Sequence, residues 1–208
     1  MPNTESALVH LIDDDEGVRE ALAILLTEAG FTVRSHKSGT DFLALLPAIE
    51  PGCIISDIRM PGIDGLELQQ LLKKAKNTLP LIFITGHGDV QMAVQAMREG
   101  AMNFIEKPFD DTILIDAVRL ALKTLRDNTA VEPAGEVKTR IDSLTAREKQ
   151  VLECLILGKA NKITAFDLNM SVRTVEVHRA RIMQKMQAAS LSELVRLVLS
   201  VQGAGTKS

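Results

Sequence analysis

Apolar and polar positions follow two alternating patterns over the first 125 residues of the chain. Short apolar runs of four or five residues are typical of buried strands, and segments with apolar residues three or four apart are typical of helices. The expected strands are Leu8–Ile12, Phe31–Arg34, Cys53–Ser56, Leu81–Thr85 and Asn103–Glu106. The expected helices lie after each strand, near 18–26, 42–46, 66–72, 89–99 and 113–125.

Five strands that alternate with five helices predict an α/β fold with a five-stranded parallel, doubly wound sheet of the flavodoxin-like kind. Gly30 and Gly100 stand where helices are expected to end, and Ser38 stands where one is expected to begin. Ligands of such sheets bind outside the carboxyl ends of the strands. Four polar residues fall at those ends, namely Asp13, Asp14, Asp57 and Thr85.

From Ser143 onward the pattern is purely helical and predicts a small all-α domain. Four helices are expected, near 146–157, 161–167, 172–186 and 191–200. The stretches TARE from Thr145 and SLSE from Ser190 both match the capping box, in which a hydroxyl and a carboxylate three residues apart satisfy backbone N–H groups. Both therefore mark helix starts.

The stretch between the two patterns, RDNTAVEPAGEVKTR, has few large apolar side chains and contains Pro133 and Gly135. It is typical of a linker, with a short helix from Glu136 onward. We therefore expect a first domain at 1–125, a linker at 126–140 and a second domain at 141–208.

Composition and charge narrow the class of protein. The chain has 208 residues, of which 46% are hydrophobic and 25% charged, as in a soluble globular protein. No apolar run approaches the ~18 residues of a membrane span, and the N-terminus lacks the features of a signal peptide, so we expect a cytoplasmic protein. Cys53 and Cys154 are too few for a disulfide framework.

Charge is distributed unevenly between the two halves. Residues 1–125 carry 11 basic and 18 acidic side chains, whereas residues 141–208 carry 10 basic and 6 acidic ones. An acidic N-terminal half and a basic C-terminal half indicate two domains with different partners. The partner of the basic domain is expected to be a polyanion.

The acidic residues at the predicted strand ends point to phosphate chemistry. Carboxylates crowded at the edge of a sheet repel one another unless a cation compensates them, and oxygen ligands of this kind suit Mg²⁺. A carboxylate beside the metal can attack a phosphoryl donor and form an aspartyl phosphate. Thr85 and Lys107 could then bind the phosphoryl oxygens. Lys107–Pro108 is a candidate cis peptide.

These residues, in this order, resemble the receiver domain of two-component response regulators over roughly residues 6–125. The resemblance implies that Asp57 is the phosphoacceptor and that Asp14 and Asp57 bind Mg²⁺, assisted by Asp13 and the backbone carbonyl of Arg59. It also places Phe104 at the aromatic switch position, where it follows Thr85 when the phosphoryl group draws that hydroxyl inward.

Two other classes use a similar sheet. A Mg²⁺-dependent phosphohydrolase also uses a strand-end aspartate with a second acid two residues later, but it usually continues with Thr where this chain has Gly17, and it carries a cap insertion. A flavodoxin-like nucleotide binder needs hydroxyl and amide donors in its first loop, where this chain has acids. The phosphohydrolase remains the alternative hypothesis.

The back half resembles the helix-turn-helix of LuxR-type regulators, on the stretches LTAREKQVL, NKITAFDLNMS and TVEVHRARIMQKM. In the helix after Ser171 we expect Val172, Val175, Ile182 and Met186 to form the core stripe. The opposite face would lie in the major groove of double-stranded DNA. The residues expected to contact bases or phosphates are Arg173, Thr174, Glu176, Val177, Arg179, Ala180, Arg181 and Lys185. The alternative is a packing or dimerisation module whose Arg residues are merely solvated.

The expected helix at 89–99 carries apolar residues on two faces. Met92, Ala93 and Ala96 cover one face, and the opposite one carries Val90, Val94 and Met97. A second apolar face favours either a partner or a wide buried stripe. The family resemblance implies that this surface makes a homodimer when the protein is phosphorylated.

Both halves together resemble the FixJ subfamily of response regulators, on ITGHGDVQMAVQAMREGAMNFIEKPF and TVEVHRARIMQKM. The resemblance implies a FixL-like sensor histidine kinase as partner, RNA polymerase as a further partner, and activation of nitrogen-fixation genes. It implies no enzyme beyond a receiver that catalyses its own phosphorylation and dephosphorylation.

Overall fold

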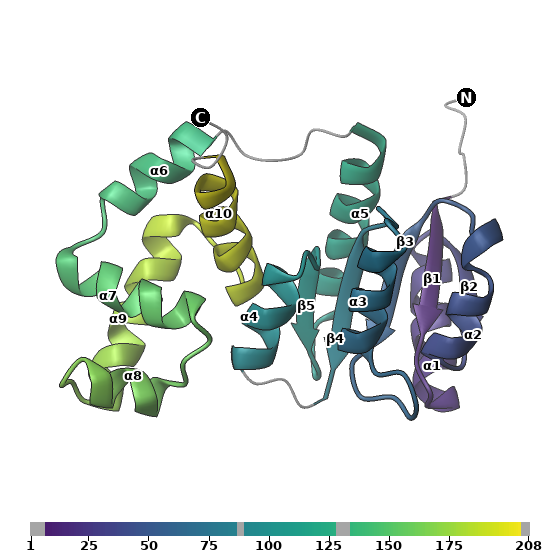
Figure 1. Cartoon of the computed structure of the whole chain (residues 1–208), viewed down its shortest axis with the longest axis horizontal. Coiled ribbons are helices and arrows are strands. Elements are labelled where there is room, and N and C mark those ends of the chain that lie inside the picture. The colour runs from purple at the N-terminus through teal and green to yellow at the C-terminus, as the bar shows by residue number, and fades with distance from the viewer. Residues whose placement is uncertain (1–6, 87–89, 128–133, 205–208) are drawn as a thin grey trace. The chain divides into compact units, whose positions relative to one another are not determined.

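The computed structural model describes residues 7–86, 90–127 and 134–204 (Figure 1). The chain divides into two compact units, one within residues 1–87 and 99–130 and the other within 88–98 and 131–208. None of the described helices is both long and apolar enough to cross a membrane.

The first unit is built on five parallel strands in the order β2-β1-β3-β4-β5. The strands are β1 (Leu8–Ile12), β2 (Thr32–His36), β3 (Cys53–Asp57), β4 (Leu81–Thr85) and β5 (Asn103–Glu106). The helices are α1 (Glu16–Glu28), α2 (Gly39–Ala44), α3 (Gly65–Lys74) and α5 (Asp111–Asp127), with a 3-10 turn at Leu46–Ala48. The predicted α/β fold with a doubly wound parallel sheet is confirmed.

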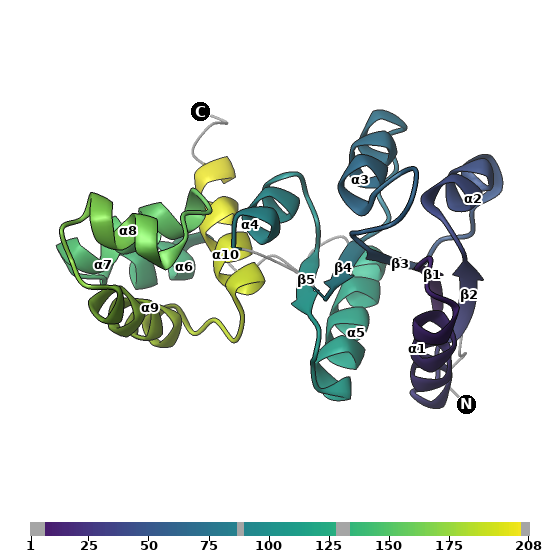
Figure 2. The same ribbon diagram turned by 90° about the horizontal axis from the view of Figure 1, so that it is seen from below.

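The helices of the first unit cover both faces of the sheet. Figure 2 shows α1 and α5 on one side and α2 and α3 on the other. The strands β1, β3 and β4 are buried almost throughout because both of their faces are covered. The core under α1 and α5 joins Val9, Leu26, Ile55 and Val118, all fully buried. The short apolar runs of the sequence are therefore the buried strands of this sheet. The segments between them are the helices that cover its two faces.

Local signals place the ends of these elements. The side chain of Ser38 accepts a hydrogen bond from the N–H of Asp41 at the start of α2, as predicted. Asp15 caps α1 in the same way through the N–H of Val18. Gly30 and Gly100 both follow helices and adopt positive φ angles, +92° and +104°, which favour glycine. The predicted cis peptide at Lys107–Pro108 is confirmed.

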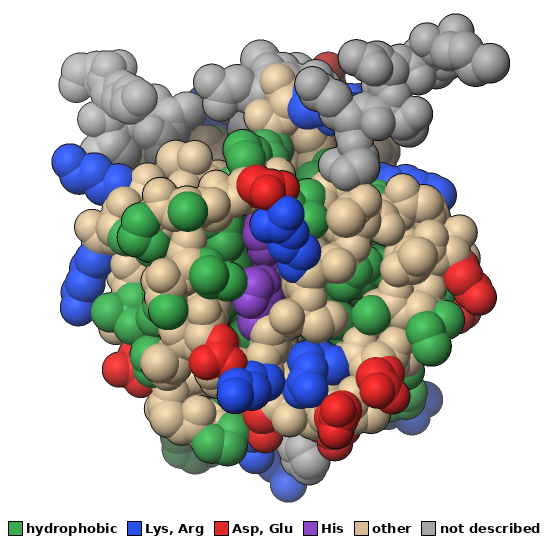
Figure 3. All heavy atoms as spheres, turned by 90° about the vertical axis from the view of Figure 1, so that its right-hand side faces the viewer, with side chains coloured by type: hydrophobic (Ala, Val, Ile, Leu, Met, Phe, Trp, Pro, Cys, Tyr) green, Lys and Arg blue, Asp and Glu red, His purple; other side chains and the backbone are tan. Residues whose placement is uncertain are grey.

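Two histidines of the first unit form a buried hydrogen-bonded chain. His10 Nε2 lies 3.0 Å from the carbonyl oxygen of Glu50, so that nitrogen carries the proton, and His10 Nδ1 accepts from His36 Nε2 at 3.4 Å. Both rings pack edge-on against Phe42. On this side of the unit, histidine side chains reach the floor of a narrow hollow bordered by charged residues (Figure 3). The pair is neutral in this arrangement.

The histidine pair should make the first unit sensitive to acid. Burial first, and then repulsion from His10, lowers the pKa of His36 from 6.5 to about 4, against a smaller opposing effect of Asp41. Burial also lowers the pKa of His10. The unfolded chain takes up these protons near pH 6.5 and the folded chain does not. The free energy of unfolding should therefore fall between about pH 6.5 and 4, by up to about 1.4 kcal/mol per pH unit from His36, and His10 should add to the loss in the same direction.

Denaturant unfolding of the wild-type protein and His36→Gln across this pH range would check the prediction. Gln can still donate a hydrogen bond to His10 but does not titrate. The variant should show a shallower loss of stability on acidification, with the two profiles differing most below pH 6. Parallel profiles would mean that the pair is not held neutral.

The second unit consists of helices. They are α4 (Val90–Arg98), α6 (Ala134–Asp142), α7 (Ala146–Ile156), α8 (Asn161–Asp167), α9 (Val172–Met186) and α10 (Leu191–Ala204). The expected linker at 126–140 thus holds the end of α5 and most of α6, and its residues 128–133 lie outside the described part of the chain. The four predicted C-terminal helices are confirmed within a few residues.

Both predicted capping boxes begin helices, with one difference. Thr145 and Glu148 satisfy each other's backbone N–H at the start of α7. At α10 the Ser190 hydroxyl accepts from the N–H of Glu193, but the Glu193 carboxylate reaches the N–H of Ala189 instead of Ser190.

The prediction that Val172 belongs to the core stripe of α9 is wrong, because Val172 is 37% exposed, whereas Val175, Ile182 and Met186 are buried. Val172 is the first residue of its helix and projects beyond the core.

Helix α4 packs against α10 inside the second unit. Val94 and Met97 are only 3% and 4% exposed, and Val90 is half-buried. The apolar face that the sequence offered for dimerisation is therefore covered in this structure, which matches the alternative of a wide buried stripe.

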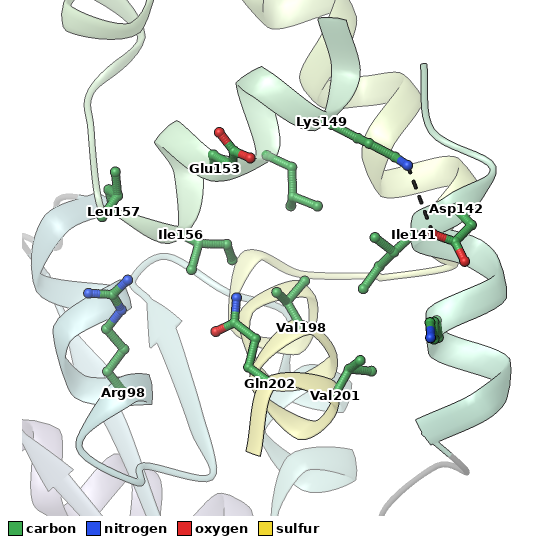
Figure 4. Close-up of a pocket in the computed structure, with 12 residues that line it drawn as sticks. Arg98, Ile141, Asp142, Lys149, Glu153, Ile156, Leu157, Val198, Val201 and Gln202 are labelled. Carbon is green, nitrogen blue, oxygen red and sulfur yellow. Dashed lines mark ion pairs between the residues drawn. The ribbon is translucent and has the colours of Figure 1, made fainter. Parts of the chain in front are cut away.

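A cavity of about 560 Å³ lies within the second unit (Figure 4). Its walls are mainly apolar side chains of α6, α7 and α10, among them Ile141, Ile156 and Val198. Lys149 and Asp142 form an ion pair at its edge, with Nζ and Oδ1 3.9 Å apart. No residue of α9 lines the cavity, so it is separate from the predicted DNA-contacting helix.

Thr164 on α8 should limit the stability of the second unit. It is 1% exposed, and its hydroxyl oxygen has no hydrogen-bond partner among the described residues. Thr164→Val keeps the shape and removes the unsatisfied group, so we expect it to raise the free energy of unfolding by about 1 kcal/mol. Thr139→Val is the control, because the exposed Thr139 hydroxyl donates to the Gly135 carbonyl. A loss of stability in Thr164→Val on thermal or urea unfolding would show that the hydroxyl is satisfied in solution.

Candidate phosphoacceptor site and nucleic-acid interface

The carboxyl edge of the sheet brings the predicted acidic residues and the lysine together. Asp13 directly follows β1, Asp57 ends β3 beside it, Thr85 ends β4 and Lys107 directly follows β5. The Lys107 ammonium lies 3.4 Å from Asp13 Oδ2 and 3.5 Å from Asp57 Oδ1. One ammonium thus faces two carboxylates, so the site has an excess of negative charge.

The Asp57 carboxylate is held in place and electrostatically unfavourable. Its Oδ2 accepts a hydrogen bond from the N–H of Arg59 at 2.6 Å, and its side chain is only 12% exposed. Burial raises the pKa of Asp57, and the charge of Asp13 adds to this, while the Arg59 N–H and Lys107 act in the opposite direction. A carboxylate with incomplete compensation is a good nucleophile and a good cation ligand.

The acidic loop after β1 has a second source of compensation that the sequence reasoning missed. Arg19, on the second turn of α1, donates from Nη1 to the backbone carbonyls of Asp13 and Asp14, at 2.8 and 3.2 Å. The Asp13 carboxylate also accepts from the N–H of Asp15. A basic residue one turn beyond an acidic run is the signal that could have predicted this. These bonds fix the backbone of the loop.

The residues expected to hold a metal only partly converge. Asp13 and Asp57 present hard oxygen ligands at one point, but Asp14 is exposed. Across the described parts of the chain, no three acidic, histidine or cysteine side chains stand together in a group that could hold an ion. The donor chemistry therefore suits Mg²⁺, and the exposed Asp14 side chain would have to turn inward to complete the set.

Of the two predicted switch residues, Thr85 ends β4 at this edge of the sheet and Phe104 lies within the neighbouring strand β5. Thr85 is 1% exposed and Phe104 is 9% exposed. The carbonyl of Thr85 accepts from the N–H of Lys107 at 2.8 Å, which ties the end of β4 to the residue that follows β5. A shift of Thr85 would therefore be transmitted to the Lys107 loop.

Helix α9 presents most of the residues predicted to contact DNA. Arg173, Thr174, Glu176, Val177, Ala180 and Arg181 are all exposed. Val175, Ile182 and Met186 on the other side are buried, so the exposed residues form one outward face. Thr174 also belongs to the N-terminal cap, because its N–H and hydroxyl both bond to the Ser171 hydroxyl.

Two of the residues predicted to contact DNA also bond to neighbouring helices. Arg179 donates to the side-chain oxygen of Asn161 at the start of α8. Lys185 lies 2.7 Å from Glu148, a residue of α7 that is only 2% exposed. The predictions that these two residues contact DNA stay untested, but the contacts give both a structural role that the sequence reasoning missed. His178, on the same helix, is half-buried.

Comparison with known proteins matches both halves of the chain, and α4 falls within the first match. Residues 9–119 match the response regulator receiver domain, and residues 142–198 match the bacterial regulatory proteins of the luxR family. The chain is 52% identical to the transcriptional regulatory protein FixJ of Azorhizobium caulinodans, over 94% of this chain and 93% of that protein. It is 41% identical to the response regulator protein TmoT of Ectopseudomonas mendocina, over 94% of this chain and 89% of that one.

Solved structures give the same picture. Full-length FixJ from B. japonicum superposes with a TM-score of 0.57 at 43% identity, covering 95% of this chain and 98% of that one. A structure of FixJ-N covers 57% of this chain and 95% of its own, at 48% identity and a TM-score of 0.55. Both likenesses support the sheet and helix order described above.

Proposed function

The chain belongs to the FixJ subfamily of two-component response regulators, and we propose that a partner histidine kinase controls its DNA binding by phosphorylating Asp57. The observation that carries the proposal is the approach of Asp13 and Asp57 to the single ammonium of Lys107. That arrangement supplies a nucleophile, a cation for the phosphoryl group and an acidic site for a metal.

The chemistry follows from the positions of these groups. An Asp57 carboxylate oxygen forms a bond to phosphorus while the bond from phosphorus to the kinase imidazole breaks, and the imidazole leaves with a proton. Oδ2 is tied to the Arg59 N–H, so Oδ1, on the Lys107 side, is the oxygen placed to attack. Lys107 would then pair with a phosphoryl oxygen, and Thr85 would donate its hydroxyl to another.

Mg²⁺ is the cofactor that we propose for this step, held by Asp13, Asp14, Asp57 and the backbone carbonyl of Arg59. When bound, the ion neutralises charge on the phosphoryl oxygens. The two carboxylates that face the single ammonium of Lys107 support the proposal, because they leave negative charge that a cation can offset. Removal of Mg²⁺ with EDTA should prevent phosphoryl incorporation from acetyl phosphate, which would test the need for the ion.

We further propose that phosphorylation moves Thr85 and Phe104 and promotes a homodimer, which binds double-stranded DNA at a two-fold site and activates transcription. In a dimer, binding of one copy of α9 holds the second copy close to its own half-site. The dimer therefore binds DNA more tightly than a single copy does. Dimerisation is not assigned to Val94 or Met97, because both side chains are buried in the present structure.

The decisive test is mass spectrometry after incubation with acetyl phosphate and Mg²⁺, followed by size measurement and DNA binding. A regulator should gain one stable phosphoryl group, then dimerise and bind DNA more tightly. Steady release of phosphate without a dimer would favour the phosphohydrolase alternative.

The placement of α9 in the major groove predicts two distinct defects. Arg181 is exposed and suited to a phosphate, so Arg181→Ala should weaken binding to all sequences about equally and reduce the salt slope by about one unit per monomer. Glu176→Ala should instead lose ~1–3 kcal/mol of discrimination at one base pair per half-site. Binding titrations on single-base variants at several salt concentrations would separate the two. If Glu176→Ala had the same base preferences as the wild type, the proposal that α9 lies in the major groove would be wrong.

A further inference from the structure

Helix α8 carries an apolar surface that neither the fold nor the DNA-contacting helix uses. Phe166 is 87% exposed and Ile163 is 53% exposed. The chain has six phenylalanines, all within its described parts, and the other five are buried or half-buried. An aromatic ring that is 87% exposed contributes little buried area to folding, and contact with another molecule would remove that apolar surface from water.

The two side chains form one patch because of helix geometry. At about 100° per residue, Ile163 and Phe166 lie about 60° apart around the axis. The buried residues Thr164 and Ala165 occupy the opposite side, which packs on the rest of the unit. Figures 1 and 2 both show α8 at the margin of the C-terminal helices, with no other helix over its outer side. We name Ile163 and Phe166 together the α8 patch.

The charges at the edges of the α8 patch are unequal. Lys162 lies beside Phe166 around the helix and is exposed, and it forms no ion pair within the described residues. Asp167, on the Ile163 side, is neutralised by Lys159, with Oδ2 and Nζ 2.6 Å apart. The patch is therefore apolar with one cationic edge, and it suits a partner surface with an apolar pocket beside an acidic residue.

DNA is a poor match for the α8 patch. A phosphate backbone offers no apolar pocket for an aromatic ring, and the patch points away from the side of α8 that packs on its neighbours. Yet α8 is rigidly joined to the proposed recognition helix, through direct packing and the bond from Arg179 to Asn161. A molecule that covers the patch would therefore sit beside DNA held by α9, in continuity with that interface.

We propose that the α8 patch is the surface through which the DNA-bound protein contacts RNA polymerase. This inference rests on the proposed function, because an activator bound at a promoter lies beside the site where the polymerase binds. Phe166 would be the central contact, Ile163 would extend it, and Lys162 would face an acidic residue of the polymerase. Aromatic side chains are enriched at the centres of protein interfaces, and polar or charged residues lie at their rims.

The test uses full-length protein phosphorylated with acetyl phosphate, a duplex selected from random DNA by the phosphorylated wild-type protein, and a purified bacterial RNA polymerase holoenzyme that the wild type activates. Phe166→Ala should reduce run-off transcription by about tenfold or more at saturating occupancy, while its Kd for the duplex stays within about twofold of wild type. Ile163→Ala should have a smaller effect. Lys162→Glu should also reduce transcription, although it leaves both apolar side chains of the α8 patch in place.

Leu157→Ala is the matched control, because Leu157 is a 57% exposed apolar residue outside α8, and it should activate normally. Weaker duplex binding by Phe166→Ala would assign the ring to the DNA interface and overturn the proposal. A change in sedimentation would assign the ring to self-association and would overturn the proposal as well, and so would unchanged transcription. Failure of the proposed function is distinguishable, since the wild-type protein itself would then not be phosphorylated or would not bind.

Discussion

Asp57→Asn is expected to reduce phosphoryl incorporation from acetyl phosphate to background and to abolish the phosphorylation-dependent gain in DNA binding. The amide cannot supply the anionic oxygen that attacks phosphorus. No other carboxylate takes its place, because Asp13 is 3% exposed and tied to the N–H of Asp15, and Asp14 points to solvent. Intact mass spectrometry and binding titrations with and without acetyl phosphate would measure both effects.

The same substitution should leave the fold intact. Burial and the charge of Asp13 raise the pKa of Asp57, so its ionised form is less stable in the folded chain than in the unfolded one. That contribution favours folding only at low pH and is lost as pH rises through the raised pKa. At neutral pH the neutral amide should therefore leave the unfolding midpoint unchanged or higher.

Asp116→Asn is the matched control for labelling, because Asp116 is an exposed aspartate on α5 that pairs with Arg119. It should incorporate phosphate at the wild-type rate. Labelling of Asp57→Asn at a Mg²⁺-dependent rate, by contrast, would move the phosphoacceptor elsewhere.

Glu148→Ala is expected to have the largest effect on the stability of the second unit. The Glu148 carboxylate is 3% exposed, pairs with Lys185 at 2.7 Å and accepts from the N–H of Thr145 at 2.8 Å. Its removal opens the cap of α7 and takes away the buried carboxylate that bonds to Lys185, which together should cost about 2 kcal/mol. Because the pair anchors the end of α9, DNA binding should fall with it.

The pH dependence of this effect has a definite sign. The hydrogen bonds from Lys185 and from the Thr145 N–H lower the pKa of Glu148 from 4.5 to about 2. The carboxylate therefore contributes stability that is complete above about pH 4.5 and is lost as pH falls toward 2. The gap in unfolding free energy between wild type and Glu148→Gln should shrink over that window.

Lys159→Ala provides the comparison. Its ion pair with Asp167 is as short, at 2.6 Å, but both side chains are about one-third exposed. Loss of a solvated pair changes stability little. Equal destabilisation in Lys159→Ala and Glu148→Ala, measured by urea unfolding, would show that burial is not what makes the Glu148 pair important.

The sequence by itself determined most of the architecture, because the signals that carry it act over short distances along the chain. Apolar spacing placed all five strands and their alternation with helices, and the Ser38 and Thr145 caps bond to N–H groups only three residues away. The acidic site was also predictable. Consecutive parallel strands end at the same edge, so Asp13, Asp57 and Lys107 had to converge, although Lys107 and Asp13 are 94 residues apart.

Only the tertiary structure decided how individual side chains are used. Lys185 and Arg179 have the sequence pattern of DNA contacts, yet each meets a partner on another helix, 37 and 18 residues away. Val94 is covered although its spacing suggested an open face, and Phe166 is exposed although its side chain is the kind that fills cores. Periodicity shows which side of a helix is apolar, but what covers that side depends on elements packed from elsewhere in the chain. That packing is why the exposed ring of α8 emerged only from the structure.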